Sequence, residues 1–454
     1  MTGKRKRKLA MPDTLIIVAS VVLLVAILSW IIPSGTYDYQ EMNINGRIRN
    51  VAIDGTYHTI DKSEVTTTGF LGFFSVLYRG CVEAADVIFM ILCCCGTFGV
   101  VVKTGAFHAG IGTILKKLKG KEILLVPIIM MIFGLGGSVF GMASEFYGFY
   151  PLIVGLGVAL GYDAMFGFAI IAVGEFVGFM GATLNPYSVG IAQTISGVEL
   201  YSGTGYRAIC FVIFMAISII YVMVYGRKIK KNPGASVVFG EKNIHAFDRD
   251  ELNEYSFTLK DGLVLLDVLV VLVVLMLGLI KWGWDFPQLC GLFLLMSMIA
   301  AAICKWSPNK WCSEFIDSAK TAMWGCILTG IAKAITVVMQ DAQIMDTVIY
   351  GLSNVLKNAP HAVSAQVMLV VQNLINFFIP SATGQASATM PIMAQLADII
   401  GVSRQTAVLA FQFGDGLSNI FWPTADIVII CGLGGISLQK WYKWFTPLFF
   451  LLSR

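Results

Sequence analysis

Long apolar runs alternate with short polar and basic segments along the whole chain. The first run, residues 14–32, follows five consecutive basic residues and is long enough to cross a bilayer as a helix. The other apolar runs are residues 69–102, 123–161, 164–195, 206–225, 263–280, 289–303, 322–339, 362–400, 406–430 and 441–452. Their number and length predict an all-α polytopic membrane protein.

Two of these runs, residues 123–161 and 362–400, are too long for one crossing, which needs about 20 residues. Each is predicted to be a re-entrant hairpin that enters and leaves on the same side, with a tip that lines a site. Two other runs are predicted to be broken helices. Their breaks fall at Asn185-Pro186 and Trp422-Pro423, because proline removes a backbone donor and the residue before it avoids the helical region.

The two halves of the chain carry the same marks in the same order. The paired marks are Gly141-Met142-Ala143-Ser144 with Gly384-Gln385-Ala386-Ser387, Pro151 with Pro391, Gly161 with Gly401, Gly174-Glu175 with Gly414-Asp415, and Pro186 with Pro423. The offset is 243 residues at the first pair, 240 at the next three and 237 at the last. This regularity predicts an internal repeat, and paired interrupted segments in a transporter mark its binding site. Two unrelated glycine-rich packing faces are the alternative.

Basic clusters near residues 116–121, 227–231 and 305–310 predict the cytoplasmic ends of helices, and the basic start predicts a cytoplasmic N-terminus. Residues 1–231 then form a first half with a small extracytoplasmic β-hairpin at 36–61. Residues 232–260 form a polar cytoplasmic linker, and residues 261–454 form the second half. Counting crossings, the first hairpin opens inward and the second outward, so the repeats are inverted.

The composition excludes several classes of protein. Hydrophobic residues make up 57% and charged residues 13%, against about a quarter charged in a soluble domain. The net charge of +4 and the scattered basic clusters argue against nucleic acid as a partner. Ten cysteines and four histidines show no ligand spacing, so no metal site beyond a Na⁺ ion, no cofactor and no catalytic residue is expected.

Neutral polar residues gather at the predicted breaks and hairpin tips. Helix N-termini there favour a carboxylate, and unwound carbonyls favour a cation. The candidate substrate-binding residues are Ser144, Thr183, Asn185, Pro186, Ser188, Ser387, Asn419 and Thr424. The alternative is that these side chains only cap broken helices.

Acidic residues in the interrupted segments are the sharper signal, since a charge at the centre of a membrane helix costs about 2.5–3.5 kcal/mol. Glu145, Glu175, Asp415 and Asp426 are the candidates for cation coupling. No Lys or Arg lies between Lys121 and Arg207. The acids are therefore expected to bind Na⁺, H⁺ or a cationic group of the substrate. The alternative is that they lie in a water-filled crevice and only cap helix ends. Lys333 either neutralises one of them or lines the path.

Three stretches together resemble the YfcC-like branch of the four-carbon-dicarboxylate anaerobic carrier family, in the ion transporter superfamily. They are residues 181–193 around Asn185-Pro186, Leu200-Tyr201-Ser202-Gly203, and residues 414–424 around Asp415 and Asn419. The resemblance implies a secondary carrier whose transport domain moves like an elevator against a scaffold, as a homodimer. Carboxylate carriers of the superfamily hold Ser-Asn-Thr at each hairpin tip, whereas these tips contain Gly-x-Ala-Ser.

These features predict a secondary active transporter, not an enzyme, in the bacterial inner membrane. Its expected substrate is a small carboxylate-bearing solute, most simply an amino acid, and a basic one in an arginine/ornithine-like exchange. A four-carbon dicarboxylate is the alternative, and a channel or an intramembrane enzyme is a remote one. Coupling to Na⁺ or H⁺ and contact with membrane lipid are also expected.

Overall fold

A computed structural model describes residues 13–44, 47–118, 122–241, 245, 257–357 and 363–453. The described chain is mostly helical, and the predicted polytopic class is confirmed. Seven of its helices are long and apolar enough to cross a membrane. They are α1 (Thr14–Ile31), α3 (Ala85–Lys103), α5 with its one-turn extension (Glu122–Phe140), α9 (Thr204–Lys231), α11 (Leu259–Lys281), α12 (Phe286–Ile303) and α14 (Met323–Asp341).

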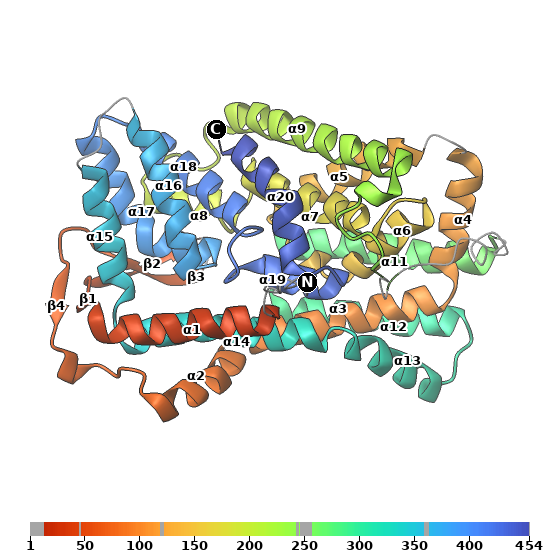
Figure 1. Cartoon of the computed structure of the whole chain (residues 1–454), viewed down its shortest axis with the longest axis horizontal. Helices are drawn as coiled ribbons and strands as arrows, with labels where there is room; N and C mark the ends of the chain where they lie inside the picture. The colour runs from red at the N-terminus through yellow and green to blue at the C-terminus, as the bar shows by residue number, and fades with distance from the viewer. Residues whose placement is uncertain are drawn as a thin grey trace, which may run out of the picture.

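One layer of the molecule is a row formed by α1 and α14 beside α3 and α12 (Figure 1). Helix α2 (Phe70–Glu83) packs along α14, and α13 (Pro308–Lys320) packs along α3. The first approach is close because a Cβ on Gly80 would overlap the backbone of Gly330 and Ala334. In each half of the chain, an amphipathic helix thus packs against a long helix of the other half.

Three helices lie where the sequence pattern predicted only connections. They are α4 (Ala106–Leu118), α13 and α15 (Met345–Lys357). Helix α13 begins inside the stretch expected to be a basic loop. Ser307 caps it by accepting a hydrogen bond from the Lys310 amide, and Pro308 occupies its first position, where proline favours a helix start.

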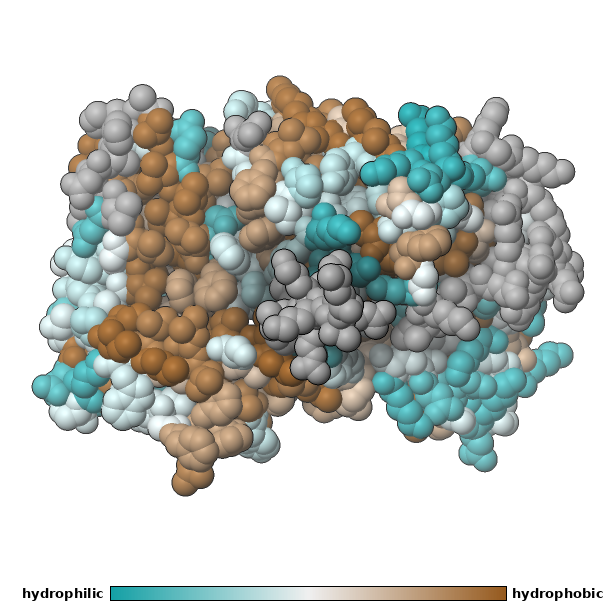
Figure 2. Space-filling model, in the orientation of Figure 1, coloured by the Kyte–Doolittle hydropathy of each residue, from teal (hydrophilic) through white to brown (hydrophobic). Residues whose placement is uncertain are grey.

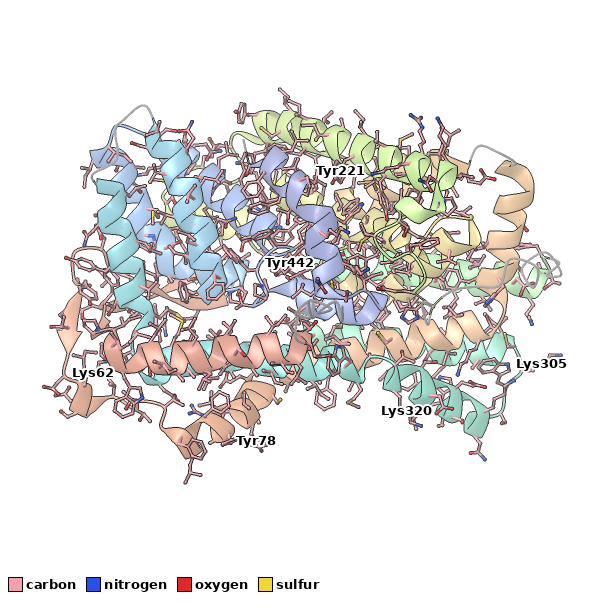
Figure 3. All side chains as sticks on the ribbon, in the orientation of Figure 1. Lys62, Tyr78, Tyr221, Lys305, Lys320 and Tyr442 are labelled. Atoms are coloured by element: carbon pink, nitrogen blue, oxygen red, sulfur yellow. The ribbon has the colours of Figure 1, made fainter. Side chains whose placement is uncertain are left out.

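The predicted β-hairpin region contains two antiparallel pairs of strands. Strand β1 (Ser34–Thr36) pairs with β4 (His58–Ile60), and β2 (Tyr39–Ile44) pairs with β3 (Arg47–Ala52) in a register that sets Tyr39 opposite Ala52. This region lies at the end of the molecule that carries Lys62. Lys305 lies at the other end (Figure 3).

A second layer contains two similar three-helix units. In the first, α5 (Leu125–Leu135) and α6 (Phe149–Ala159) pack against α7 (Ala164–Met180). Met130 lies beside Gly174 and Gly134 beside Gly178, so α5 and α7 run parallel. Helix α6 returns antiparallel, since its Gly157 meets Gly167.

The start of α5 and the end of α6 consequently lie at the same end of the first unit. The ammonium of Lys230, near the end of α9, hydrogen-bonds Glu122 at 3.3 Å and lies 4.8 Å from the centre of the Tyr162 ring. Glu122 precedes α5 and Tyr162 follows α6. Although residues 122–140 have the length of a span, the chain therefore reverses beyond them and comes back.

The second unit consists of α16 (Ser364–Phe378), α17 (Ala382–Ile399) and α18 (Arg404–Ser418). The turn between α17 and α18 forms the outer end of this unit. It lies near the N-terminal end of α9, whereas the outer end of the first unit lies near the C-terminal end of α9. Arg404 pairs with Asp398 at 2.7 Å and donates to the Ser196 carbonyl at 2.9 Å, and Gln405 donates to the Ser202 carbonyl at 2.6 Å, just before α9 begins. The two hairpins thus approach from opposite ends of α9.

Both predicted helix interruptions are present. Helix α7 ends at Met180 and α8 (Val189–Ile195) begins nine residues later, with Asn185-Pro186 between them. Helix α18 ends at Ser418 and α19 (Asp426–Gly434) follows the Trp422-Pro423 break. Helix α20 (Leu438–Leu452) ends the described chain.

Apolar side chains gather over α1 and along α9 on the face shown in Figure 2. Ile27 and Trp30 of α1 and Ile209, Val212 and Ile220 of α9 are more than half exposed or close to it. Hydrophilic residues gather instead at the C-terminal end of α9 and over α13 (Figure 2). This division is the one a bilayer requires of a spanning protein.

Candidate functional site

The two helix interruptions and the second hairpin tip meet at the middle of the second layer. Gln412 of α18 donates to the Phe179 carbonyl at 2.7 Å, and a Cβ on Gly416 would overlap the backbone of Met180. At the hairpin tip, Thr383 donates its hydroxyl hydrogen to the Tyr187 carbonyl at 2.8 Å. Residues of both halves therefore build one site.

Glu175 of α7 is fully buried within this region. The hydroxyl of Tyr150, from hairpin helix α6, donates to Glu175 Oε2 at 2.8 Å. The other oxygen, Oε1, is buried and has no hydrogen-bond partner among the described residues. One oxygen of this carboxylate is thus held by a neutral donor, and the other keeps unused hydrogen-bonding capacity.

Asp415 of α18 repeats this arrangement in the second half. It is also fully buried, and its Oδ1 accepts a hydrogen bond from the Asn376 amide at 2.7 Å. Its Oδ2 has no partner. Asn376 belongs to hairpin helix α16, so in each half a hairpin helix supplies the neutral donor.

Amides surround Asp415 on its hairpin side. The Asn376 amide nitrogen also lies 3.1 Å from Asn419 Oδ1 and 3.2 Å from Gln385 Oε1. Gln385 in turn donates to Gln372 Oε1 at 2.7 Å. These side chains come from α16, α17 and the end of α18, and their mutual hydrogen bonds fix the position of the carboxylate.

The other two predicted acids differ in their surroundings. Asp426, at the start of α19, accepts a hydrogen bond from the Tyr147 hydroxyl at 2.8 Å. Glu145 accepts from the Ala143 amide at 2.9 Å, within its own turn. Over the described ranges, none of the four acids forms an ion pair with Lys or Arg.

Among the neutral candidates, Asn185 caps the backbone with its side-chain oxygen, while its side-chain nitrogen makes no hydrogen bond within the described residues. Its Oδ1 accepts from the amides of Tyr187 and Ser188 at 2.9 and 3.2 Å, which is the predicted capping role. Its Nδ2 has no partner. Gly141, at the first hairpin tip, has a φ of 68° and lies so close to Asn185 that a Cβ would overlap its side chain.

Thr183 and Ser387 are held by neighbouring groups. The hydroxyl groups of Thr183 and Ser138 share a hydrogen bond, with 3.2 Å between their oxygens. Ser387 donates to the Thr383 carbonyl of its own helix at 2.9 Å and lines a separate cavity. Ser144 lies in the short turn that follows the first tip, and Pro186 lies between Asn185 and Tyr187 in the first break.

Within the described ranges, five predicted site residues carry a buried polar atom that has no hydrogen-bond partner. These atoms are Glu175 Oε1, Asn185 Nδ2, Ser188 Oγ, Asp415 Oδ2 and Thr424 Oγ1. Most buried polar atoms in folded proteins are satisfied, so such a group of atoms indicates a place for a ligand or ordered water. The structure thus brings these residues to the two interruptions with unused hydrogen-bonding capacity.

Sequence reasoning missed the neutral partners Tyr147, Tyr150, Gln372 and Asn376. A signal was present in two of them, because Gln372 and Asn376 are four apart and share one face of an otherwise apolar helix. The tyrosines follow the first tip at a spacing of three, and their apolar rings hid their hydrogen-bonding role.

The described part of the chain holds no group of three or more His, Cys, Asp or Glu side chains that could bind a metal ion. A Na⁺ ion at Asp415 would need amide and backbone oxygens for its remaining ligands, and Asn419 Oδ1 lies nearby.

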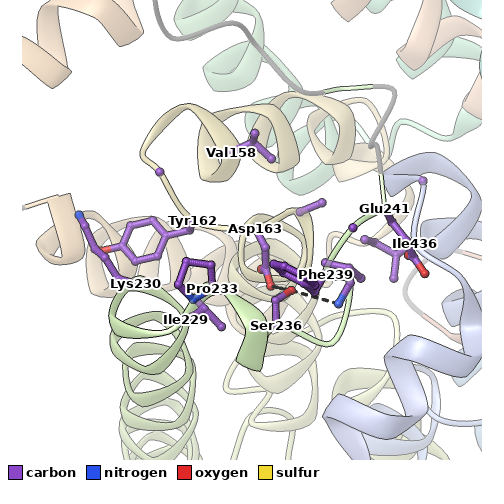
Figure 4. A pocket seen from close by; sticks show the side chains of 15 residues that line it. Val158, Tyr162, Asp163, Ile229, Lys230, Pro233, Ser236, Phe239, Glu241 and Ile436 are labelled. Carbon is purple, nitrogen blue, oxygen red and sulfur yellow. Dashed lines mark hydrogen bonds between the residues drawn. The ribbon is translucent and has the colours of Figure 1, made fainter.

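A cavity of about 480 Å³ lies at the turn between α6 and α7, away from these residues (Figure 4). Asp163 there accepts a hydrogen bond from Ser236 at 2.6 Å, and the cavity wall includes Phe239 and Glu241. Ser236 and Val238 of the predicted linker are therefore packed onto the second layer. None of the predicted site residues lines this cavity.

The apolar spanning helices and the polar site between two interrupted helices define a multi-pass membrane transporter. The chain belongs to the DcuC family of C4-dicarboxylate anaerobic carriers, which its residues 11–452 match. It is 33% identical, over 97% of this chain and 94% of the relative, to an Escherichia coli K12 protein named "Putative basic amino acid antiporter YfcC". It is 27% identical, over 98% and 95%, to an uncharacterized protein of Haemophilus influenzae.

Two solved structures are similar at low sequence identity. One is Neisseria gonorrhoeae MtrF, described as illuminating a class of antimetabolite efflux pumps, with 15% identity, 98% and 94% coverage and a TM-score of 0.44. The other is the Alcanivorax borkumensis YdaH transporter, with 14% identity, 97% and 96% coverage and a TM-score of 0.40.

Proposed function

We propose that this protein is a secondary active transporter that moves a small carboxylate-bearing solute across the bacterial inner membrane by alternating access. A basic amino acid, moved by exchange or by a Na⁺ or H⁺ gradient, is the substrate we favour. The name of the Escherichia coli relative supports a basic amino acid. A four-carbon dicarboxylate is the second candidate, because the family is described by that substrate.

The observation that carries this proposal is the matched pair Glu175 and Asp415. Each is fully buried, each has one oxygen held by a neutral donor, and each has one oxygen without a partner. An ionised carboxylate in such a place needs a cation, and a protonated one needs an acceptor. Binding and release of Na⁺, H⁺ or a substrate cation there would couple to transport.

The arrangement of the hairpins supports alternating access. Their outer ends lie at opposite ends of α9, and their tips approach the same interruptions. Inverted repeats of this kind allow one site to open to either side. In our proposal the layer of α1, α3, α12 and α14 is the scaffold, and the two hairpin units form a transport domain that moves past it like an elevator.

The orientation in the membrane follows from charge. Lys228, Lys230 and Lys231 end α9, and Lys305 lies toward the same end of the molecule (Figures 1 and 3). Positive residues favour the cytoplasmic side, so we assign this end to the cytoplasm and the β-strands to the outside. A cytoplasmic N-terminus and a homodimer, which the family resemblance implies, belong to the same proposal.

Counterflow in proteoliposomes tests the function. Vesicles loaded with unlabelled arginine should take up labelled arginine, and vesicles loaded with succinate should take up labelled succinate only if the second candidate is right. Imposed Na⁺ and pH gradients then separate exchange from gradient-driven uptake. If neither solute exchanges and neither accumulates under any gradient, the proposal fails for both substrates.

A further inference from the structure

A second cavity, of about 440 Å³, lies between the tip of the second hairpin and the scaffold. Helix α14 contributes Lys333, Thr336 and Gln340, and strands β2 and β3 contribute Tyr39 and Asn50. The first turns of α17 close the opposite wall with Ser381, Gly384 and Ser387. Parts of the chain that we assign to different domains therefore share this cavity.

Lys333 is the one charged residue among those that line the cavity. It is only partly exposed, and within the described ranges it forms no ion pair. Two acids that follow Lys333 in the sequence are engaged elsewhere: Asp341, the last residue of α14, pairs with Arg79 at 2.9 Å. Asp346 accepts hydrogen bonds from the Tyr39 hydroxyl at 2.8 Å and the Tyr37 amide at 3.0 Å.

The rest of the lining suits a small organic anion. Hydroxyl and amide groups of Thr336, Gln340, Asn50 and Ser381 are neutral, and Ile379, Pro380, Met345 and Ala388 supply apolar surface. A partly buried ammonium without a counter-charge is costly, and a carboxylate beside it removes that cost. The space exceeds the needs of a water molecule and is of the size of a small-ligand pocket.

Helix α17 separates this cavity from the Asp415 site. Its Gln385 and Thr389 belong to the amide network around Asn376, while its Gly384, Ser387 and Ala388 face the cavity. The two sites therefore lie on opposite faces of the same hairpin tip. The same hairpin tip thus contributes to both the Lys333 cavity and the Asp415 site.

We propose that Lys333 binds the carboxylate of the transported solute in this cavity, so that the scaffold recognises the anionic group and the transport domain recognises the rest. This inference rests on the proposed function. It predicts that a free carboxylate is required of the substrate, whether that substrate is an amino acid or a dicarboxylate.

The test uses the full chain in proteoliposomes, with labelled arginine and labelled succinate as probes and with agmatine, which is arginine without its carboxylate, as a competitor. Lys333→Gln should raise the KM of the carboxylate-bearing substrate about tenfold or more, because a charged hydrogen bond is lost. The inhibition constant of agmatine should be the same for Lys333→Gln as for the wild type. Lys333→Arg keeps the charge and should stay within about threefold of the wild-type KM. Lys320→Gln, on the exposed end of α13, is the matched control and should match the wild type.

The arms of this experiment separate the possible outcomes. An effect on arginine identifies an amino acid carboxylate, and an effect on succinate identifies a dicarboxylate. An unchanged KM in Lys333→Gln overturns the inference while leaving transport itself established. If Lys333→Gln does not fold, Ser387→Asp replaces it, with Lys320→Gln still as control: a fixed carboxylate in the cavity should raise the KM of the carboxylate-bearing substrate, and an unchanged KM overturns the inference. Failure of the wild type to transport either probe would instead refute the proposed function.

Discussion

Tyr150 donates its hydroxyl hydrogen to Glu175 at 2.8 Å and so joins hairpin helix α6 to broken helix α7. Both residues are fully buried, and Glu175 Oε1 remains without a partner. This bond joins the hairpin to the broken helix. We therefore expect that protonation of Glu175, or binding of a cation to it, changes how firmly the hairpin is held. The same relation links Asn376 and Asp415 in the second half.

We predict that Glu175→Gln and Asp415→Asn each abolish gradient-driven accumulation while leaving exchange largely intact. Both substitutions keep the shape and the hydrogen-bonding capacity of the side chain but remove the charge that a coupling cation needs. Uptake under imposed Na⁺ and pH gradients measures the first effect, and counterflow measures the second. Asp317→Asn, on the exposed face of α13, serves as control. Normal accumulation with unchanged Na⁺ and pH dependence in both variants would show that these acids are caps.

Tyr150→Phe should weaken both stability and coupling. It removes the one hydrogen bond to Glu175, and leaving a buried acceptor unsatisfied costs about 1–3 kcal/mol. We expect a lower thermal unfolding midpoint in detergent and an altered pH dependence of uptake. Tyr162→Phe is the matched control, because the Tyr162 ring lies under Lys230 at the outer end of the hairpin. A wild-type pH profile in Tyr150→Phe would limit Tyr150 to a packing role.

Gly416→Ala should destabilise the contact between the two broken helices. A Cβ at this position overlaps the backbone of Met180, which has no flexible end that can move aside, and overpacking of this kind costs about 1–3 kcal/mol. Gly351→Ala, on α15, is the control because nothing lies within 4 Å of its added Cβ. That control should unfold at the wild-type temperature or slightly above it. Equal midpoints for both variants would contradict the close approach.

Asp163→Ala should release the start of the linker from the second layer. The Asp163 carboxylate accepts hydrogen bonds from Ser236 at 2.6 Å and from Phe166 N at 2.7 Å, and Figure 4 shows the cavity that surrounds it. We expect faster trypsin cleavage after Lys231 in the variant than in the wild type. Asp163→Asn retains the cap of α7 and should give an intermediate rate. Cleavage at the wild-type rate in Asp163→Ala would show that other contacts hold the linker.

The length and number of the apolar runs determined the helical class. A segment in a bilayer must satisfy its backbone hydrogen bonds internally and needs about 20 residues to cross as a helix. Glycine and proline determined the two interruptions for an equally local reason: they change the backbone at their own positions. The repeated acids at 175 and 415 were visible because a charge inside an apolar run is expensive wherever the run packs. These features depend on neighbouring residues along the chain.

Tertiary structure alone decided which groups meet. The partners of Glu175 and Asp415 are Tyr150 and Asn376, at separations of 25 and 39 residues, and only the folding back of each hairpin brings them into contact. Lys333 could not be placed from its own helix, because its surroundings come from strands and a hairpin tip on either side of it in the sequence. Such contacts depend on how helices pack across the chain, and local pattern carries no information about that packing.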